Sequence, residues 1–485
     1  MKILVTHSYF LRFDAKQWKQ QQPYAPLATL YAVSVLENLN HDVVFTDMMF
    51  AKSADEIIPH LQRHKPDIVL IYDDGFNYLT KMCLTNMREA CFSMINYSKQ
   101  SQCKVIVSSS DSTDHSDEYL KHGADFILVG EGETTLKLLV EKIENNDLDF
   151  TEVAGLRFLN DGKMLATPPR DVIRELDSIP LPAWDKIDMQ SYKHAWQKKW
   201  GYFSINMTTT RGCPFKCNWC AKPIYGNRYN VRSAALVVDE LVMLKKKLNY
   251  NHVWFCDDIF GLKPGWIKQF AEAIKSRNLK IKFKIQCRAD LLLEENNIQW
   301  LAQAGCDEVW MGAESGSQKI LDAMDKGTKI EQIELATALL KKHGIKPCFF
   351  LQFGYPGEIK EDILLTLNMV NKLQPFDIGV SVSYPLPGTK FYETVKSQLS
   401  QKSNWSDSDE LALMFKNTYP SSFYKELHRY LHRKFRGRQG VSAWQKIASF
   451  KRINLGQLKS AVLMPYHFVQ QFYHQIQLQK FDFKV

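Results

Sequence analysis

The stretch Arg211-Gly212-Cys213-Pro214-Phe215-Lys216-Cys217-Asn218-Trp219-Cys220 decides the fold of this chain. Its cysteines are spaced Cys-x3-Cys-x2-Cys, and three thiolates on one loop can ligate three irons of a cubane cluster. The fourth iron would then have no protein ligand and would be open to a substrate or cofactor. Zinc is the alternative, but zinc sites normally have four ligands in paired spacings, and no fourth Cys or His stands nearby at such a spacing. The sequence therefore predicts a [4Fe–4S] cluster on Cys213, Cys217 and Cys220.

Six short, mostly apolar runs between residues 201 and 395 alternate with helical patterns and predict parallel strands. They are Phe203–Thr210, His252–Asp257, Lys282–Arg288, Glu308–Ala313, Pro347–Phe353 and Asp377–Tyr384. Strands joined by right-handed helical crossovers favour a partial (β/α)6 barrel over an open sheet. The first strand runs directly into the cysteine loop, so we expect that loop at the carboxyl end of the barrel.

Polar residues and glycines stand where these strands end. In barrels the chemistry gathers at the carboxyl ends of the strands, so these residues are expected to face the cysteine loop. The candidates are Asp257, Asp258, Arg288, Glu314, Gly354 and Gly357. For each acid the alternative is a structural role as the cap of the helix that follows it.

With Trp219 just before the third cysteine, the loop resembles the signature loop of the radical SAM enzymes. The resemblance implies that the open iron chelates the amino and carboxylate groups of S-adenosylmethionine. It also implies that an electron, delivered by a donor such as flavodoxin or ferredoxin, splits the sulfonium into methionine and a 5′-deoxyadenosyl radical. That radical would take a hydrogen atom from an unactivated carbon of a small-molecule substrate.

The same resemblance gives the strand-end residues individual roles. Glu314 matches the family's ribose-binding position, and an ionised carboxylate is a pure acceptor for the ribose hydroxyls. Arg288 would supply counter-charge to the methionine carboxylate. The residues expected beside the adenine are Trp219, Gly354 and Gly357, and those expected beside the methionine or the substrate are Asp257 and Asp258.

Residues 1–145 repeat a strand-then-helix rhythm that predicts a doubly wound, Rossmann-like (flavodoxin-like) α/β domain. The expected strands are Lys2–Tyr9, Asp42–Asp47, Asp67–Asp74, Lys104–Ser110 and Ala124–Glu131. A ligand of such a domain sits at the carboxyl ends of the strands. There Gly130-Glu131-Gly132 precedes a helix, and its two glycines allow close backbone approach.

This domain resembles the cobalamin-binding domain that precedes the radical core in one large class of radical SAM enzymes. The matching pieces are Ala25-Pro26-Leu27-Ala28, Gly123-Ala124-Asp125 and Gly130-Glu131-Gly132-Glu133. No Asp-x-His-x-x-Gly surrounds His7, so His7 is interpreted as structural rather than as an axial ligand. Ser108, Ser109 and Ser110 stand where the family has a glycine pair, and their hydroxyls could bond the nucleotide tail. The alternative is an α/β domain that no longer holds cobalamin.

Residues 146–200 are proline-containing and predict a linker with a short hairpin over Val153–Leu159. Residues 396–485 predict a basic helical extension, with helices over Asp407–Phe415 and Phe423–Phe435. From Ser421 to Val485 there are twelve Lys/Arg and two Asp/Glu, so this segment carries a charge of +10. The whole chain carries +9, so the rest of the chain is close to neutral. Solvated helix faces explain such a segment; of the functional alternatives, an anionic membrane surface is favoured over nucleic acid.

The composition bounds the remaining possibilities. An apolar content of 45% and a charged content of 24% are ordinary for a globular protein of 485 residues. The first residues enter a strand pattern without a signal peptide, and no run of about eighteen apolar residues occurs. Ten cysteines without a secretory signal favour metal ligation over disulfides and a reducing, cytoplasmic setting, with peripheral membrane contact through the C-terminal segment as a further expectation. The seven cysteines outside the loop are isolated, so no second cluster is predicted.

The sequence hypothesis is therefore a cobalamin-dependent radical SAM enzyme that methylates an unactivated carbon of an unidentified substrate, which the resemblance to this class suggests is lipophilic or polycyclic. Its cofactors would be a [4Fe–4S] cluster, S-adenosylmethionine and cobalamin. The enzymatic alternative is an oxidative cyclase, as in the anaerobic protoporphyrin ester cyclases. A different class of hypothesis is a non-catalytic iron–sulfur sensor or binding protein.

Overall fold

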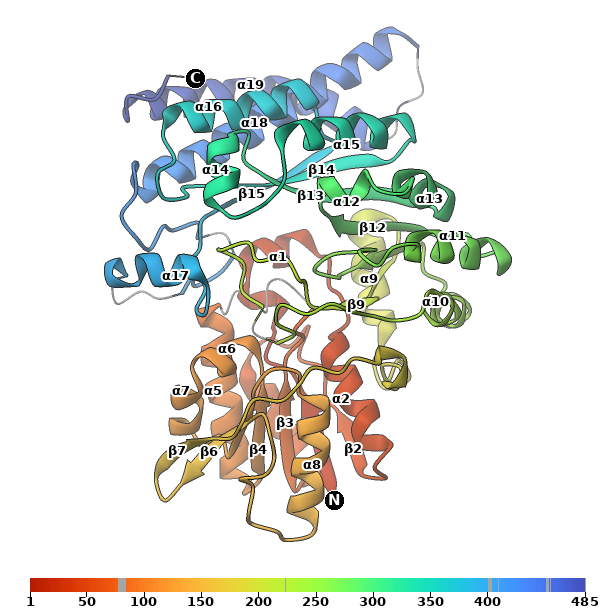
Figure 1. Cartoon of the computed structure of the whole chain (residues 1–485), viewed down its shortest axis with the longest axis vertical. Helices are drawn as coiled ribbons and strands as arrows, with labels where there is room; N and C mark the ends of the chain where they lie inside the picture. Colours follow the sequence, from red (N-terminus) through yellow and green to blue (C-terminus); the bar gives the residue numbers. More distant parts are fainter. Residues whose placement is uncertain are drawn as a thin grey trace.

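The computed structural model describes residues 1–76, 84–222, 224–399, 404–408, 410–450, 453 and 455–484. Figure 1 shows a lower sheet built from the N-terminal part of the chain, an upper sheet above it, and two long C-terminal helices at the far end. The expected fold class is confirmed: a doubly wound α/β domain, a partial barrel and a helical extension follow one another along the chain.

The lower sheet is built on apolar strands, and all of them except the edge strand Asp42–Phe45 are largely buried, as parallel strands covered on both faces should be. Its parallel members are β1 (Lys2–Thr6), β2 (Asp42–Phe45), β3 (Ile68–Tyr72), β4 (Lys104–Ser108) and β5 (Phe126–Leu128). They lie in the order β2-β1-β3-β4-β5, which is the flavodoxin-like order. Helices α2 (Leu27–Glu37) and α8 (Glu133–Glu144) pack together on one face, and α3 (Ile58–His64) and α5 (Thr85–Gln100) pack together on the other.

Two further strands extend this sheet beyond the five expected. The hairpin of β6 (Leu156–Asn160) and β7 (Lys163–Ala166) adds to β5 in antiparallel register, so part of the expected linker belongs to the first sheet. Its turn is Asp161-Gly162, and both residues have positive φ, as a two-residue turn of this kind requires. Helix α9 (Met189–Trp200) follows and buries Tyr192 and Trp196 between the two sheets.

The upper sheet contains the six strands that the sequence predicts. They are β8 (Ser204–Met207), β11 (His252–Phe255), β12 (Lys282–Cys287), β13 (Cys306–Glu314), β14 (Lys346–Phe353) and β15 (Asp377–Val382). All neighbours are parallel and in chain order, and β8 and β15 form the two edges, so the barrel is incomplete. The crossover helices are α10 (Ala234–Leu248), α11 (Trp266–Ser276), α13 (Asn297–Ala304), α15 (Ile330–Lys342) and α16 (Lys360–Leu373).

The C-terminal extension differs from its prediction in one place. The helix expected over Asp407–Phe415 is wrong, because the described residues of this segment are irregular and bond to other elements. The Trp405 carbonyl accepts from Thr85 N–H, and Ser408 N–H donates to Asp14. The helix expected over Phe423–Phe435 is confirmed and is longer: α18 (Ser421–Ala448) packs antiparallel against α19 (Leu455–Gln479).

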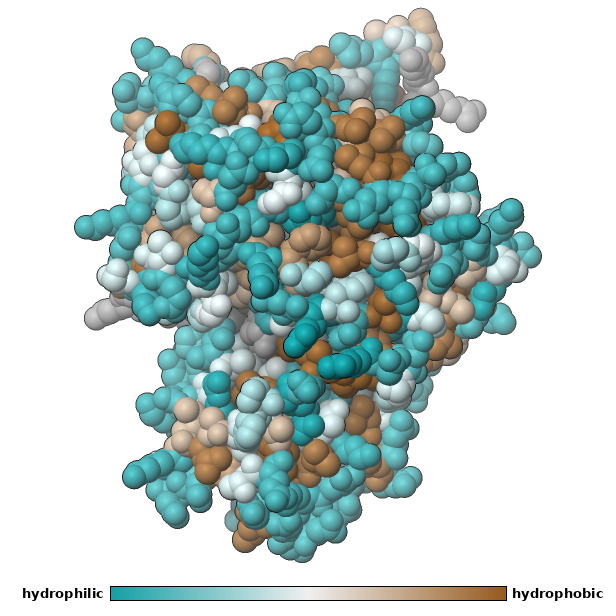
Figure 2. Space-filling view, in the orientation of Figure 1, coloured by the Kyte–Doolittle hydropathy of each residue, from teal (hydrophilic) through white to brown (hydrophobic). Residues whose placement is uncertain are grey.

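The surface of the molecule is mostly polar. Figure 2 shows hydrophilic side chains over most of the visible face, with apolar patches between them. Among the described residues, no helix combines the length and the apolar character needed to cross a bilayer.

Candidate cluster and cofactor site

The cysteine loop begins in a backbone conformation that only glycine adopts easily. Gly212 has φ +78°, and a side chain there would lie 2.5 Å from the carbonyl oxygen of Arg228. The short strands β9 (Thr210–Arg211) and β10 (Asn230–Val231) pair in antiparallel fashion and close the loop at its base. Cys213, Cys217 and Cys220 are therefore displayed on one closed loop, each partly exposed and none in a disulfide.

A buried cation ties this loop to the first domain. Arg211 donates to Glu131 Oε1 at 2.5 Å, and its other nitrogen lies 2.7 Å from Glu133 Oε1. Burial raises the pKa of Glu131 above the usual range of a glutamate, and the Arg211 guanidinium acts in the opposite direction. The guanidinium also lies 5.3 Å from the Tyr31 and Tyr225 ring centres. The Gly130–Glu133 stretch, expected at a cofactor, thus anchors the start of the cysteine loop.

Asp257 supports the same loop from the second barrel strand. Its Oδ1 accepts from the N–H groups of Thr209 and Thr210 at 2.7 and 2.9 Å, and its Oδ2 accepts from the Thr209 hydroxyl at 2.6 Å. The side chain is buried, and burial raises its pKa to about 6. The structure therefore places the Asp257 oxygens on the strand that leads into the cysteines, while Asp258 is the next residue outward and is exposed.

Residues between the cysteines contact the ends of other barrel strands. The Arg288 guanidinium stacks on the Phe215 ring at 3.8 Å and pairs with Asp290 at 2.8 Å. A second nitrogen of Arg288 donates to the Lys326 carbonyl at 2.8 Å. Arg288 thus lies at the cluster loop as expected, but its charge is already balanced by Asp290.

The last part of the loop is held from the opposite side of the barrel. Asn218 N–H donates to the Met324 carbonyl at 3.0 Å, and Asn218 Oδ1 accepts from the Tyr355 hydroxyl at 2.9 Å. Trp219 Nε1 is buried and has no hydrogen-bond partner within the described part of the chain. A buried N–H without an acceptor is costly, so Trp219 offers a donor that fits a ligand.

Glu314 and Lys326 form a buried ion pair beside the cysteines. Lys326 Nζ lies 2.8 Å from Glu314 Oε1, and both side chains are buried. Glu314 has φ +55°, a strained conformation for a non-glycine residue that is common at functional sites. A side chain at Gly312 would lie 2.5 Å from Lys326 Nζ, so the pair needs glycine there. Burial acts to lower the pKa of Lys326, but Glu314 and then Cys217 raise it above its usual value.

The loop that follows β14 contacts the C-terminal extension. Gly354 has φ +74°, donates its N–H to Glu358, and approaches Leu413 and the Tyr424 ring. Gly357 has φ +82° and open space where a side chain would be. Burial raises the pKa of Glu358 to about 8. Of the two glycines expected at the adenine, only Gly357 is left uncovered by the extension.

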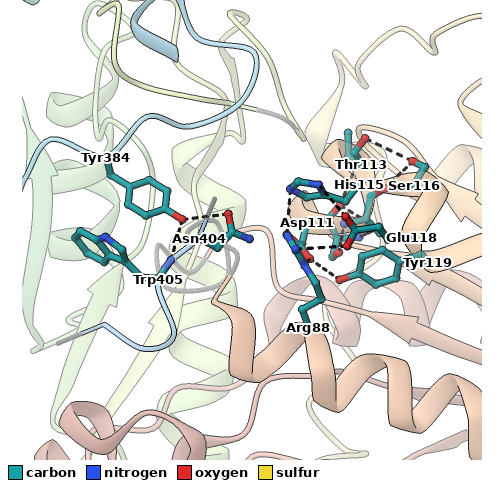
Figure 3. A network of polar contacts seen from close by, with 12 residues as sticks. Arg88, Asp111, Thr113, His115, Ser116, Glu118, Tyr119, Tyr384, Asn404 and Trp405 are labelled. Carbon is teal, nitrogen blue, oxygen red and sulfur yellow. Dashed lines mark hydrogen bonds and ion pairs between the residues drawn. The ribbon is translucent and has the colours of Figure 1, made fainter. Parts of the chain in front are cut away.

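In the first domain, the serines after β4 enter a rigid polar network. Ser109 caps helix α6 (Ser110–Asp114) by accepting from Ser112 N–H at 2.8 Å. Asp111 accepts two hydrogen bonds of 2.6 Å from Arg88, and a third from the Tyr119 hydroxyl at 2.7 Å (Figure 3). Burial alone would raise the pKa of Asp111, but the bidentate Arg88 holds it below its usual range. These partners fix the loop that carries Ser108, Ser109 and Ser110.

Some groups at this edge of the first sheet remain available to a polar ligand. Ser110 Oγ is buried without a hydrogen-bond partner within the residues that the structure describes. Gly130 has φ +77°. Gly132 is the N-cap residue of α8, and the Tyr72 hydroxyl fits beside it only because Gly132 has no side chain. Glu131 is not available, because Ile173 N–H occupies its second oxygen. The hydroxyls and glycine backbone fit a polar cofactor tail, and the acid does not.

His7 and the cysteines outside the loop can be compared with their sequence predictions. Both ring nitrogens of His7 have partners, Nε2 with Asp47 at 2.9 Å and Nδ1 with Tyr9 N–H at 3.3 Å, which fits a structural residue. The described cysteines outside the loop are buried, and burial raises the pKa of Cys287 to about 12. Cys83 lies outside the described residues.

Three of the residues that build this site are not among those that the sequence predicts. Arg211 and Glu133 were part of recognised motifs, but their pairing joins segments about 80 residues apart and leaves no local signal. Lys326 follows a short helix in an otherwise polar stretch, and only the barrel brings it to Glu314. The one signal for Arg211 in the sequence is its charge, which is opposite to that of Glu131 and Glu133 in the other motif.

Comparison with known proteins gives this site a context. Residues 207–370 match the model of the radical SAM superfamily, and this range includes all three loop cysteines. An uncharacterized methyltransferase of Pyrococcus horikoshii is 30% identical over 283 residues, which cover 58% of this chain and 60% of that protein. The chain thus aligns with less than two thirds of that relative. The anaerobic magnesium-protoporphyrin IX monomethyl ester cyclase of Synechocystis is 26% identical over 400 residues, covering 81% and 77%.

A solved structure shares the whole fold. The cobalamin-dependent S-adenosylmethionine radical enzyme OxsB, with aqua-cobalamin bound, matches with a TM-score of 0.76 at 17% identity. The match covers 98% of this chain and 72% of that chain. At this identity the likeness concerns the fold alone: a first α/β domain, a barrel and a C-terminal region occur in the same arrangement.

Proposed function

We propose that this chain, in which residues 207–370 form a radical SAM domain, cleaves S-adenosylmethionine reductively and methylates an unactivated carbon of a small-molecule substrate. One observation carries the proposal. The three cysteines lie on a closed loop whose two ends are fixed by Arg211 and Asn218, directly beside the buried Glu314–Lys326 pair. A redox sensor has no need for that pair.

The donor set fits a [4Fe–4S] cluster. Cys213, Cys217 and Cys220 are partly exposed thiols without a disulfide, and the spacing supplies three ligands rather than four. When bound, the cluster supplies the electron that cleaves the sulfonium. The protein's own part is to hold the loop: Arg211 and Asp257 support its start, and Phe215 and Asn218 fix its later residues.

S-adenosylmethionine would bind between this loop and the ends of β13 and β14. Glu314 would accept from the ribose hydroxyls, and Lys326 would offer its ammonium to the methionine carboxylate once the two side chains separate. Trp219 Nε1 would donate to the nucleoside, which removes its unsatisfied hydrogen bond. Arg288 would contribute through its stacking on Phe215 rather than as a free counter-charge.

Cobalamin is proposed as the methyl source. Ser108, Ser110, Gly130 and Gly132 at the carboxyl ends of β4 and β5 would hold its polar tail, since Ser110 Oγ is an orphaned buried hydroxyl. When bound, cobalamin supplies the methyl group that the substrate receives. The first sheet presents these strand ends toward the cysteine loop, as the Arg211–Glu131 contact requires.

Oxidative cyclisation is the second candidate function. It is favoured by the cyclase of Synechocystis, which aligns with a larger share of this chain than the methyltransferase of Pyrococcus horikoshii does. Both candidates share the cleavage of S-adenosylmethionine and differ in what the substrate radical does next. Both also need an external electron donor of the flavodoxin or ferredoxin type.

From its charge of +10, we propose in addition that the segment Ser421–Val485 contacts an anionic membrane surface.

The test is anaerobic reconstitution with iron and sulfide, followed by strong reductant and S-adenosylmethionine. Release of 5′-deoxyadenosine and methionine supports the radical chemistry, and its absence from an intact cluster favours a sensor. With cobalamin and a lipophilic substrate extract, S-adenosylhomocysteine formed alongside deoxyadenosine supports methyl transfer. Deoxyadenosine without S-adenosylhomocysteine supports cyclisation or rearrangement instead.

A further inference from the structure

Helix α19 presents an apolar face to solvent along most of its length. Exposed apolar side chains recur every three or four residues and form what we call the α19 stripe: Leu458, Val462, Tyr466, Val469, Tyr473 and Ile476. At about 100° per residue, these positions fall within an arc of about 90° on one side of the helix. Val462 and Val469 are each 67% exposed. A continuous stripe of this kind marks an interaction surface, unlike apolar residues scattered singly.

Another side of α19 packs against α18, so the stripe faces outward. Ala461 and Leu478 are buried, and His474 pairs with Glu426 of α18 at 2.6 Å. Gly440 of α18 lets the two helices approach closely, because a side chain there would lie 2.6 Å from Met464 Cβ. Figure 1 places this helix pair at the end of the molecule farthest from the first sheet.

The surroundings of the stripe are aromatic and cationic. Residues 455–479 contain no Asp or Glu and a single cation, Lys459. The Arg433 guanidinium of α18 lies 5.0 Å from the Tyr466 ring centre at the edge of the stripe. Trp444, 48% exposed, donates its indole N–H to the Ala461 carbonyl at 3.0 Å. Apolar stripes with flanking cations and with Trp and Tyr are typical of helices that lie in a membrane interface.

We infer that α19 lies in the plane of an anionic bilayer, with the α19 stripe buried at the boundary between headgroups and acyl chains. The inference rests on the membrane contact proposed above and names the element that inserts. Charge selects lipid over a second copy of the chain. Pairing two stripes would bring together two segments that each carry +10, whereas anionic headgroups complement that charge.

The test uses the full-length protein and sedimentation with two kinds of vesicle, phosphatidylcholine alone and phosphatidylcholine with phosphatidylglycerol. We expect binding to the anionic vesicles, and a loss of about tenfold or more in the partition coefficient for Val462→Glu/Val469→Glu. The matched control is Leu236→Glu/Met243→Glu, which puts two acids seven residues apart on the exposed side of α10. This control should bind as the wild type does. Melting curves check that both pairs fold.

The outcomes separate the inference from the contact on which it rests. Binding that high salt removes but Val462→Glu/Val469→Glu leaves intact would overturn insertion of α19 and keep a purely electrostatic contact. No binding of the wild type to anionic vesicles would overturn both. A dimer in light scattering that Val462→Glu/Val469→Glu disperses, without vesicle binding, would assign the stripe to a second copy. A lipid-dependent blue shift of tryptophan fluorescence that Trp444→Phe reduces would support insertion.

Discussion

Arg211 of the cysteine loop donates to Glu131 at the end of β5, so the two sheets of this protein meet at a buried ion pair two residues before the first cysteine. Glu133 lies on the same guanidinium, and both acids belong to the stretch expected to hold a cofactor. Two carboxylates on one cation leave little freedom in this contact. The position of the cluster loop relative to the first domain is therefore set by residues of both domains.

Arg211→Met should destabilise the protein by about 3–5 kcal/mol, because it leaves two buried carboxylates without their cation. It should also lower iron loading, since the start of the loop loses its anchor. Thermal unfolding and iron analysis after reconstitution measure the two effects. Arg277→Met, which breaks the ion pair of Arg277 with Asp239 on the surface, is the control and should leave both values near those of the wild type.

The triple variant Arg211→Met/Glu131→Gln/Glu133→Gln tests the cause. Neutralising both carboxylates should recover much of the lost stability if buried charge is the reason for the loss. Unchanged instability in the triple variant would instead assign the effect to lost packing against Tyr31 and Tyr225.

Each of Cys213→Ala, Cys217→Ala and Cys220→Ala should abolish the cluster, whereas Cys306→Ala and Cys83→Ala should leave it. Cys306 is buried, which raises the pKa of its thiol well above the usual value and disfavours the thiolate that iron needs. Iron analysis of the wild type should give about four irons per chain. About eight irons, or zinc in their place, would contradict a single cubane.

The strands and the cysteine loop could be predicted because their signals are local. Runs such as Ile68–Tyr72 are apolar throughout and bounded by polar residues, and the strands predicted for each sheet pair in parallel. The match of residues 207–370 to the radical SAM superfamily likewise confirms the resemblance drawn from the cysteine spacing. The sequence also predicts a short hairpin, but over Val153–Leu159; the observed hairpin runs from Leu156 to Ala166 and joins the first sheet.

What the sequence could not predict depends on contacts between distant segments. Asp407–Phe415 contains leucine, methionine and phenylalanine residues that favour a helix, yet its neighbour Trp405 bonds to Thr85, more than 300 residues away in sequence. Arg288 was expected to be a free counter-charge, and the fold gives it Asp290 and Phe215. Lys326 carried no signal, because its burial beside Glu314 exists only once β13 and the chain after α14 (Gln318–Ala323) are packed.

Glu314→Ala and Lys326→Met should each weaken S-adenosylmethionine binding about 10- to 100-fold, the loss expected for one charged hydrogen bond. The cluster should stay intact in both, since neither side chain is a ligand. Deoxyadenosine yield over a range of S-adenosylmethionine concentrations measures the effect, with the cluster absorbance as the internal check. Lys329→Met, an exposed lysine three residues along, should match the wild type.

The alternative for this pair is a purely structural ion pair. In that case Glu314→Ala would lower the melting temperature but leave the concentration dependence of deoxyadenosine formation unchanged. Glu314→Gln would distinguish the two further, because an amide keeps an acceptor for the ribose while it removes the charge that pairs with Lys326.

Glu358 should make stability depend on pH in the direction opposite to that of a salt-bridged acid. Its carboxyl is buried, Oε2 accepts from Gly354 N–H at 2.6 Å, and Oε1 has no hydrogen-bond partner within the described residues. Burial raises its pKa from 4.5 to about 8. Between these two values the folded protein binds a proton that the unfolded chain has released, so the free energy of unfolding falls as pH rises through this window.

Glu358→Gln should therefore be less pH-dependent than the wild type between pH 5 and about 8, and more stable than it at pH 8. At about 1.4 kcal/mol per pH unit, the window corresponds to at most about 5 kcal/mol of unfolding free energy. Denaturant melts at several pH values measure the difference. Tyr424→Phe alters the same pocket without removing the carboxyl, so it should keep the pH slope of the wild type. Equal pH slopes for Glu358→Gln and the wild type would mean that Glu358 stays ionised in the folded protein. That result would require solvent to reach Oε1, which contradicts the close packing of Leu413 and Tyr424 on the Gly354 loop.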